Sequence, residues 1–398
     1  MSNPLLQLRE LGQSVWLDYL NRKILQDGEL TRLIREDGLK GMTSNPSIFE
    51  KAIGEADDYD ASIRSALATQ DAEPMALYEE LAIADIQAAA DLLRPVYDEL
   101  NGTDGFVSLE VSPYLAMDSE ATVAEGRRLW ARVARPNVMI KVPGTKAGPK
   151  AISHLVGEGI NVNVTLLFGI DAYLAAAEAH MAGLEAYKVA GGDPAKVHGV
   201  ASIFVSRIDG KIDNEIDRRL QAAAGEDAEA LKKLRGKVAI ANAKVAYQRY
   251  LELLDGARWK ALSASGATPQ RLLWASTGTK DKAYSDVLYV EALIGPDTIN
   301  TMPPMTMDAF RDHGQARPTL TQGVSEAYDA LAAADRLGLD LKGVTEALVA
   351  EGVKSFAESF DDLLAAVADK SAAATKGRPA SQTESASATT PIATDSRH

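Results

Sequence analysis

The sequence predicts an α/β fold, specifically a (β/α)₈ TIM barrel with additional helices. Three observations lead to this prediction. Short runs rich in apolar and β-branched residues alternate with longer helical patterns through residues 1–370. Most of the short runs are almost continuously apolar, as in a parallel sheet covered on both faces. The alternation occurs eight times, which is the strand number of this barrel.

The eight candidate strands follow one another at spacings that leave room for a helix between most neighbours. In chain order they are 14–20, 38–44, 105–111, 137–142, 160–168, 197–205, 271–276 and 297–302. The helical patterns lie at 74–100, 119–134, 147–157, 171–190, 208–222, 227–255, 282–294 and 320–337. The connections after the second and sixth strands are long, and we expect them to contribute extra helices.

Two further segments follow the eighth strand and its helix. The helical patterns at 341–350 and 355–368 are expected to pack outside the barrel or over one of its ends. From Ser371 the composition changes to mostly Ala, Ser and Thr, with no aromatic residue and Ile392 as the one large aliphatic side chain. Such a segment cannot bury a core, so residues 371–398 are predicted to be a disordered tail.

Composition excludes several classes of function. The chain has 398 residues, a formal net charge of −14 and no cysteine. Without cysteine there are no disulfides, thiolate metal sites or cysteine nucleophiles. The acidic balance argues against nucleic acid as a main partner. No apolar run approaches the roughly 18 residues of a membrane span. The N-terminus lacks the pattern of a signal peptide, so we expect a cytoplasmic protein.

Motifs for common cofactors are missing from the sequence. There is no G-x-x-x-x-G-K-[ST] loop and no G-x-G-x-x-G after a strand. The five histidines are scattered along the chain, which argues against a histidine-based zinc site or a Ser-His-Asp triad. We therefore predict no metal and no cofactor. No pattern in the sequence sets an oligomeric state.

In a barrel, polar residues at the carboxyl ends of the strands form the active site. The first three strands offer Asp18, Asn45 and Glu110 at such positions. A carboxylate within a strand is costly to bury without a partner. Each residue has a simpler interpretation: a hydrogen-bonded or outward-facing Asp18, a turn-opening Asn45 before Pro46, and a solvent-exposed Glu110.

The fifth and sixth strands add polar residues at spacings of two. Asn161, Asn163 and Thr165 share one face of the fifth strand, and Ser202 and Phe204 share one face of the sixth. Three polar residues on one face of a buried strand are unusual. They indicate either a site or a hydrogen-bonded polar layer of the core.

Two cations follow neighbouring strands in this acidic protein. Arg207 comes just after the sixth strand, and Lys280 follows the seventh together with Ser276 and a Gly that lets backbone N–H groups approach a ligand. Such a pair indicates a phosphate site. The alternative is two solvated surface cations.

Lys141 lies within the apolar fourth strand, NVMIKV, directly before a Pro-Gly turn. An apolar environment disfavours the charged ammonium of a lysine. A neutral amine can attack a carbonyl carbon and form a Schiff base. The alternative is a lysine whose head reaches water past the strand end. The polar residues on adjoining strands favour the first interpretation, whereas Lys146 and Lys150 lie in the following loop and helix.

Taken together, these segments resemble the transaldolase family. The blocks that carry the resemblance occur in family order across most of residues 12–310: GMTSNPSIFEKAI, VSLEVSP, NVMIKVPGT, GINVNVTLLF and SIFVSRID. The length, SIFVSRIDGKID and LLWASTGTKDKAYSDVLYVEALIG are more similar to the longer bacterial subgroup. The resemblance implies a class I aldolase barrel without metal. It also implies transfer of a dihydroxyacetone unit from sedoheptulose 7-phosphate to glyceraldehyde 3-phosphate, giving erythrose 4-phosphate and fructose 6-phosphate.

The resemblance also implies roles for individual residues. Lys141 would form the Schiff base, and Asp18 would act as acid and base on the C4 hydroxyl. Glu110 and Thr165 would hold a water that shuttles protons during dehydration of the carbinolamine. The remaining family positions would bind the phosphorylated sugar: Asn45 and Asn163 through its hydroxyls, Ser202 and Phe204 as pocket walls, and Arg207 at the phosphate. The short enterobacterial type has an arginine after strand seven, and here Ser276 and Lys280 are assigned in its place.

Two other functions compete with this interpretation. A fructose 6-phosphate aldolase of the same superfamily would release free dihydroxyacetone by hydrolysis. That family carries Gln and Tyr where this chain has Glu110 and Phe204, so both positions favour transfer. A catalytically silent sugar-phosphate-binding barrel is the second alternative, since fold does not fix function. The complete set of Asp18, Glu110, Lys141 and Thr165 argues against it.

Overall fold

Eight parallel strands form a closed barrel in the order of the sequence, β1 to β8. A computed structural model describes residues 3–69 and 73–376 of the chain. Every predicted strand is present, and the predicted (β/α)₈ barrel is confirmed. The strands are β1 (Gln13–Asp18), β2 (Leu39–Thr43), β3 (Phe106–Glu110), β4 (Val138–Pro143), β5 (Val162–Leu167), β6 (Gly199–Phe204), β7 (Arg271–Ala275) and β8 (Thr298–Met302).

Burial on both faces explains why these strands could be recognised. All residues of β4, β5, β6 and β8 are buried, so their sequences have no solvent-facing alternation. Their side chains fill either the barrel interior or the layer between strands and helices. The barrel closes where β1 pairs with β8, Gln13 opposite Thr298.

Five predicted helices occur with ends shifted by at most two residues, and a sixth starts four residues later than predicted. They are α6 (Pro74–Glu99), α7 (Ser119–Val133), α8 (Gly148–Val156), α9 (Ile170–Val189), α10 (Ser206–Leu220) and, with a later start than expected, α16 (Val324–Arg336). The two long connections also behave as expected. The β2–β3 connection contains α4 (Pro46–Glu55), α5 (Asp60–Thr69) and α6, and the β6–β7 connection contains four helices.

Three helical predictions need correction. The pattern at 227–255 is two helices, α11 (Gly225–Leu234) and α12 (Val238–Asp255), because Gly236 adopts a φ of 69° between them. The pattern at 282–294 reduces to α14 (Leu288–Ala292). The patterns at 341–350 and 355–368 form one continuous helix, α17 (Leu341–Lys376).

Several short helices were not predicted individually, although those between β2 and β3 and between β6 and β7 match the extra helices expected in these long connections. They are α1 (Pro4–Glu10), α2 (Arg22–Gln26), α3 (Glu29–Glu36), α13 (Ala257–Ser263) and α15 (Pro304–His313), together with α4, α5 and the 3₁₀ turns η1 (Asp57–Tyr59), η2 (Pro113–Leu115) and η3 (Pro194–Lys196). Most have ten residues or fewer, too short for a clear apolar period.

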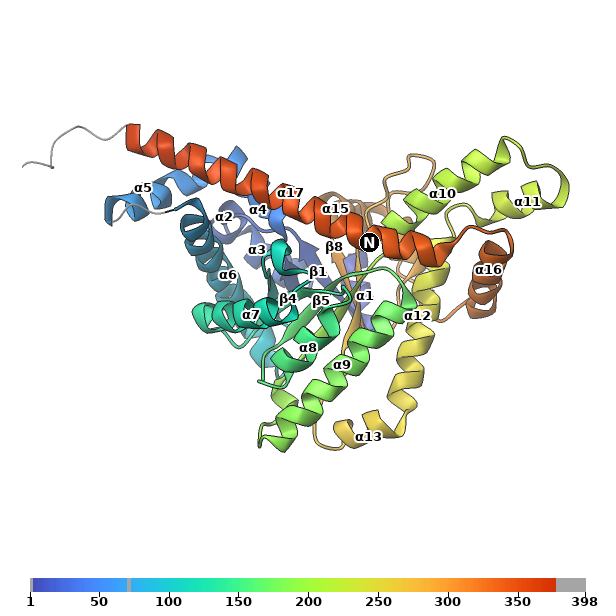
Figure 1. Cartoon of the computed structure of the whole chain (residues 1–398), viewed down its shortest axis with the longest axis horizontal. Coiled ribbons are helices and arrows are strands. Elements are labelled where there is room, and N and C mark those ends of the chain that lie inside the picture. Colours follow the sequence, from blue (N-terminus) through green and yellow to red (C-terminus); the bar gives the residue numbers. More distant parts are fainter. Residues whose placement is uncertain (1–2, 70–72, 377–398) are drawn as a thin grey trace, which may run out of the picture.

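Helix α17 runs across the molecule at one end of the barrel, from α5 to α10 (Figure 1). It packs most extensively along α4. Polar contacts fix it at both ends: Lys370 Nζ donates to Ala56 O at 2.6 Å, and Lys211 Nζ pairs with Glu351 at 2.6 Å. Of the two positions expected for the last helical segments, outside the barrel or over one of its ends, the structure shows the second.

The boundary of the predicted tail falls inside this helix. Residues 371–376 continue α17, although a disordered tail was predicted from Ser371. The rest of that predicted tail, 377–398, lies outside the described residues.

Candidate active site

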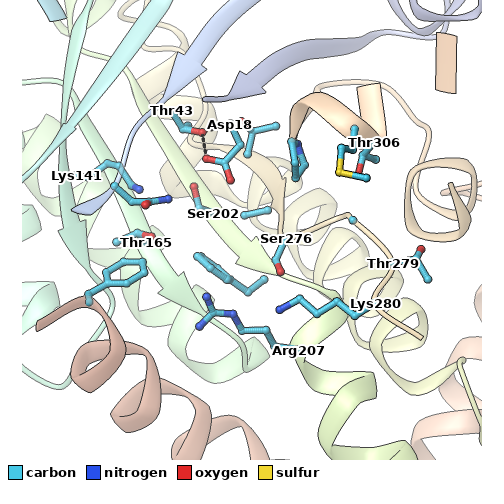
Figure 2. A pocket seen from close by; sticks show the side chains of 18 of the residues that line it. Asp18, Thr43, Lys141, Thr165, Ser202, Arg207, Ser276, Thr279, Lys280 and Thr306 are labelled. Carbon is cyan, nitrogen blue, oxygen red and sulfur yellow. Dashed lines mark hydrogen bonds between the residues drawn. The ribbon is translucent and has the colours of Figure 1, made fainter. Parts of the chain in front are cut away.

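A cavity of about 370 Å³ opens at the carboxyl ends of the strands, the end that α17 partly covers. Side chains from the ends of most strands converge on it (Figure 2). Nine of the eleven residues predicted for the site line this cavity: Asp18, Asn45, Lys141, Thr165, Ser202, Phe204, Arg207, Ser276 and Lys280. Glu110 and Asn163 are the two exceptions, and both contact residues that do line it.

Lys141 is buried, with 4% of its surface exposed, so it does not reach bulk water past the strand end. Its Nζ donates to the backbone carbonyl of Ser44 at 2.9 Å and lies 3.1 Å from Glu110 Oε2. Both partners come from neighbouring strand ends, β2 and β3. The amine is therefore held in a fixed position at the wall of the cavity.

Glu110 lies next to Lys141 because the two residues are register partners on β3 and β4. Burial raises the pKa of this carboxyl group above its usual range, and the charge of Lys141 opposes part of that rise. Glu110 does not line the main cavity. It borders two small cavities of about 10 and 20 Å³, where Tyr78 and Phe360 are its neighbours.

Asp18 ends β1 on the opposite side of the cavity from Thr165 (Figure 2). Its Oδ1 accepts a hydrogen bond of 2.6 Å from the Thr43 hydroxyl, which is also 2.8 Å from Thr301 Oγ1. Burial raises the pKa of Asp18, while the bond from Thr43 and the charges of Lys141 and Arg207 oppose the rise. A carboxylate with a raised pKa is a stronger base than an ordinary one, which suits it to accept and return a proton.

The polar face of β5 divides between the cavity and the core. Thr165 lines the cavity, and its buried hydroxyl makes no hydrogen bond to the described residues. Asn163 is completely buried: Ser202 Oγ donates to its Oδ1 at 2.7 Å, and its Nδ2 donates to Ser108 Oγ at 3.0 Å. Asn161 serves the core, where its amide bonds backbone groups of Val138 and His198.

The backbone of β5 is irregular directly after Thr165. Leu166 has a φ of 58°, and the pairing of β5 with β6 shifts register between Val164 and Leu167. A positive φ is costly for a branched side chain, and such positions cluster at functional sites. The bulge changes the direction of the strand where its end meets the cavity.

Asn45 opens the helix that follows β2. Its side-chain oxygen accepts the N–H of Ile48 at 3.0 Å and so caps α4, which the Asn-Pro turn signal in the sequence is typical of. The same residue lines the cavity, and the preceding carbonyl binds Lys141. Asn45 therefore opens a turn, as the simpler interpretation predicts, and also lines the cavity.

A cationic corner, defined here as Arg207 and Lys280, forms the side of the cavity away from Asp18 (Figure 2). Within the described residues neither cation has an acidic group at ion-pair distance. Burial lowers the pKa of Arg207, and partial burial together with the charge of Arg207 lowers that of Lys280. Two unpaired cations facing one cavity make an anion site.

Ser276 and Phe204 shape this corner. Ser276 has a φ of 55°, and its hydroxyl lies 3.0 Å from Ser206 Oγ. The Arg207 guanidinium lies over the Phe204 ring at 5.3 Å from its centroid. Phe204 in turn packs on Phe168. The arginine thus rests on an aromatic surface that faces the cavity.

Sequence reasoning missed several residues of the cavity. Thr43 is the last residue of β2 and Thr301 the last but one of β8, so the strand-end criterion could have found them. Thr306 and Met305 lie at the start of α15, a helix that was not predicted. Phe356 enters from α17, and no local pattern connects a helix so far along the chain with the barrel mouth.

The cavity offers no set of metal ligands among the described residues. Across residues 3–69 and 73–376, no group of three or more His, Asp or Glu side chains is arranged to hold a metal ion. A buried amine, two carboxyl groups and a cationic corner therefore define the chemistry of the cavity.

In the described ranges 3–69 and 73–376, every helix is too short or too polar to cross a membrane.

Comparisons with known proteins show which family the chain is similar to. A family model described as transaldolase/fructose-6-phosphate aldolase matches residues 15–367. Transaldolase 2 of a Nostoc species is 47% identical over 372 residues, covering 91% of this chain and 96% of its own. The transaldolase of Thermobifida fusca is 47% identical over 376 residues, covering 94% and 100%. That of Thiobacillus denitrificans is 49% identical over 357 residues, covering 90% and 97%.

Proposed function

The chain belongs to the transaldolase/fructose-6-phosphate aldolase family, and we propose that Lys141 carries its transaldolase reaction through a Schiff base. The donor is sedoheptulose 7-phosphate and the acceptor is glyceraldehyde 3-phosphate. A dihydroxyacetone unit moves between them, leaving erythrose 4-phosphate and forming fructose 6-phosphate. One observation carries the proposal. The buried amine of Lys141 faces the same cavity as Asp18 and lies 3.1 Å from Glu110.

In the first step the amine of Lys141 attacks the C2 carbonyl of the donor. Glu110 supports this step because its raised pKa allows it to take the ammonium proton across 3.1 Å. The carbinolamine then loses water to give the imine. Glu110, with the unpaired hydroxyl of Thr165 on the other side of Lys141, would hold the water that carries protons between these groups.

In the second step Asp18 removes the proton of the C4 hydroxyl, and the C3–C4 bond breaks. The electron pair of that bond moves into the protonated imine and leaves an enamine on Lys141, while the four-carbon aldehyde departs. The carboxyl group of Asp18 now holds the proton. It returns the proton to the new alkoxide when the enamine attacks the aldehyde carbon of the acceptor. Hydrolysis of the product imine then frees Lys141.

Substrate contacts follow from the walls of the cavity. Arg207 and Lys280 would bind the phosphate group, with Ser276 beside them. Asn45 would meet the hydroxyls of the dihydroxyacetone unit. Asn163 is linked to the cavity through Ser202, so its amide would orient the Ser202 hydroxyl as well as act directly.

Borohydride trapping tests the proposal. Fructose 6-phosphate is added, the adduct is reduced, and the modified peptide is identified by mass spectrometry. A three-carbon adduct is expected on Lys141 and is expected to disappear when glyceraldehyde 3-phosphate is added before the borohydride. A Lys141→Met variant should give no adduct.

The matched control is Lys150→Met, which removes an exposed lysine of α8 that pairs with Glu120. It should be labelled on Lys141 like the unmodified protein. An adduct on any lysine other than Lys141 would contradict the mechanism. An adduct that water discharges as fast as the acceptor does would favour an aldolase over a transferase.

A further inference from the structure

Helix α10 carries an acidic stripe that the chemistry above does not use. The stripe consists of Asp209, Asp213 and Asp217, which are spaced by four residues and so share one face of the helix. Asp209 and Asp213 are 1% and 6% exposed. Arg207, two residues before Asp209, points to the cavity instead. Helix α10 therefore carries a cation that faces the cavity near its N-terminus and, along another face, a row of three carboxylates.

The two buried carboxylates are used in the same way. Asp209 accepts a hydrogen bond from the Tyr289 hydroxyl at 3.1 Å and one from the Ala239 N–H at 2.8 Å. Asp213 accepts one from the Tyr284 hydroxyl at 2.8 Å and one from the Gly236 N–H at 3.0 Å. Asp209 thus joins the β7–β8 connection to the first turn of α12, and Asp213 joins it to the α11–α12 connection.

Arg235 adds a further link between α10 and the β7–β8 connection. Its guanidinium pairs with Asp217 of α10 at 3.0 Å and with Asp281 of the β7–β8 connection at 3.2 Å. It also donates to the Tyr284 hydroxyl at 3.1 Å. Asp281 directly follows Lys280 in the chain. The contacts therefore fasten the β7–β8 connection at three positions after the lysine, Asp281, Tyr284 and Tyr289.

Burying these carboxylates has a cost. Burial raises the pKa of both groups, that of Asp209 to about 7. Apolar residues at these positions would avoid that cost. What the carboxylates provide is a set of directional bonds to one loop, and that loop holds Lys280 beside Arg207, a like charge (Figure 2). Repulsion between two nearby cations would move a free loop outward.

We propose that the hydrogen bonds Asp209–Tyr289 and Asp213–Tyr284 position the β7–β8 connection, so that Lys280 stays beside Arg207 in a preformed phosphate site. The four residues are positioning residues that act through Lys280. The inference rests on the proposed function, because that function assigns the phosphate to Arg207 and Lys280.

The test removes the two hydroxyls and leaves the rings in place. The variants are Tyr284→Phe, Tyr289→Phe and the pair. The control is Tyr59→Phe, because Tyr59 is also buried and donates a hydrogen bond, at 2.7 Å, to a buried carboxylate, Asp85 of α6, outside the β7–β8 connection. Binding of inorganic phosphate is measured by calorimetry, which needs no turnover. Amide hydrogen exchange of residues 277–287 is measured in parallel.

The paired variant should bind phosphate about fivefold more weakly or worse, and residues 277–287 should exchange faster. The KM for fructose 6-phosphate should rise by a similar factor, while kcat/KM for unphosphorylated fructose changes less than about twofold. The control should change none of these. Equal losses for fructose and fructose 6-phosphate would mean a general structural role and would overturn the inference. Unchanged phosphate binding would also overturn it.

A Lys280→Met background separates the inference from the proposed function. If the tyrosines act through Lys280, the paired Phe substitutions should add little on this background. A full additional loss of phosphate binding would overturn the inference, and so would a Lys280→Met variant that binds phosphate normally. Neither outcome affects borohydride trapping at Lys141. Failure of that trapping, with coupled phosphate binding intact, would instead contradict the mechanism alone.

Discussion

At the scale of single residues, the contact between Lys141 and Glu110 determines the character of the site. A buried ion pair is weak evidence for stability, since removing two charges from water offsets much of their attraction. Here the pair instead places a carboxyl group of raised pKa against a primary amine. Such a pair can exchange one proton without solvent, which a Schiff-base lysine requires before each attack.

A Glu110→Gln variant should separate this role from packing. The amide keeps the shape of the side chain but cannot take the ammonium proton, so kcat should fall by about 10²–10⁴-fold. Rapid-quench borohydride trapping should show slower adduct formation on Lys141. The control is Glu125→Gln, a half-buried carboxyl group whose pKa is also raised by burial and which bonds the Ser112 N–H. It should change kcat less than about threefold, and equal losses in both variants would contradict the assignment.

The residues that the sequence could identify share one property. Asp18, Lys141 and Thr165 lie on strands whose register follows from continuous apolar runs, so their direction into the barrel could be inferred. The link between Ser202 and Asn163 could not be inferred, because it depends on how two side chains on neighbouring strands pair. The Ser44 carbonyl that holds Lys141 is a backbone group and leaves no signal in residue type.

At the scale of elements, the differences between prediction and structure have tertiary causes. The pattern 227–255 has no break in its apolar period, yet α11 and α12 are separate. Gly236 takes a positive φ there, and its N–H binds Asp213. Gly352, which lies between the helical patterns predicted at 341–350 and 355–368, stays helical within α17, where any side chain larger than hydrogen would meet Leu166. Both outcomes depend on residues distant in sequence.

Helix α17 supplies one wall of the cavity through Phe356, which belongs to a buried stripe with Phe360, Leu363 and Val367. This helix covers the barrel end where the enamine would form. An enamine that meets water is protonated and lost as free dihydroxyacetone, so exclusion of water favours transfer. The helix therefore has a chemical consequence besides the stability it adds.

A Phe356→Ala variant should lose about 2–4 kcal/mol of unfolding free energy and release more dihydroxyacetone per transfer event. The control is Leu363→Ala, two helical turns further along the same stripe and absent from the cavity lining. It should lose similar stability in urea titrations without raising hydrolysis. The measurement is the ratio of free dihydroxyacetone to fructose 6-phosphate formed. An unchanged ratio in Phe356→Ala would contradict the role of α17 in excluding water.

At the scale of the whole molecule, the barrel brings two cations together in a chain that is acidic overall. The chain carries a net charge of −14, which repels anionic substrates at a distance. The cationic corner acts only inside the cavity, where the low local dielectric strengthens it. Arg207 lies in the first turn of α10, directly after β6, and Lys280 follows β7, so the pairing of these two adjacent strands makes the cations neighbours. The overall fold and this proximity could be predicted from strand order and burial, whereas the hydrogen bonds from Tyr284 and Tyr289 to α10 could not, because they depend on how distant side chains pair.

The pH dependence of overall stability should report on buried histidine. His180 is 1% exposed, neither ring nitrogen has a hydrogen-bond partner among the described residues, and burial lowers its pKa to about 3. The unfolded chain takes up a proton at this residue below its ordinary pKa of 6.5, and the folded chain does not until about 3. The stabilising contribution is therefore complete above pH 6.5 and is lost as the pH falls toward 3. Between pH 6.5 and 4 the loss should be on the order of 3 kcal/mol.

A His180→Gln variant should remove this pH dependence, whatever its effect on stability at pH 7. Urea unfolding at pH 6.5, 5 and 4 should give a free energy that falls less steeply than in the unmodified protein, by on the order of 3 kcal/mol over that range. The control is His154→Gln, an exposed histidine on α8, which should leave the slope unchanged. A cavity created by the substitution lowers the unfolding free energy equally at each pH, so comparing the slopes of the pH profiles removes its effect. Parallel pH profiles for His180→Gln and the unmodified protein would show that His180 is protonated in the folded state, and that its burial does not limit stability in acid.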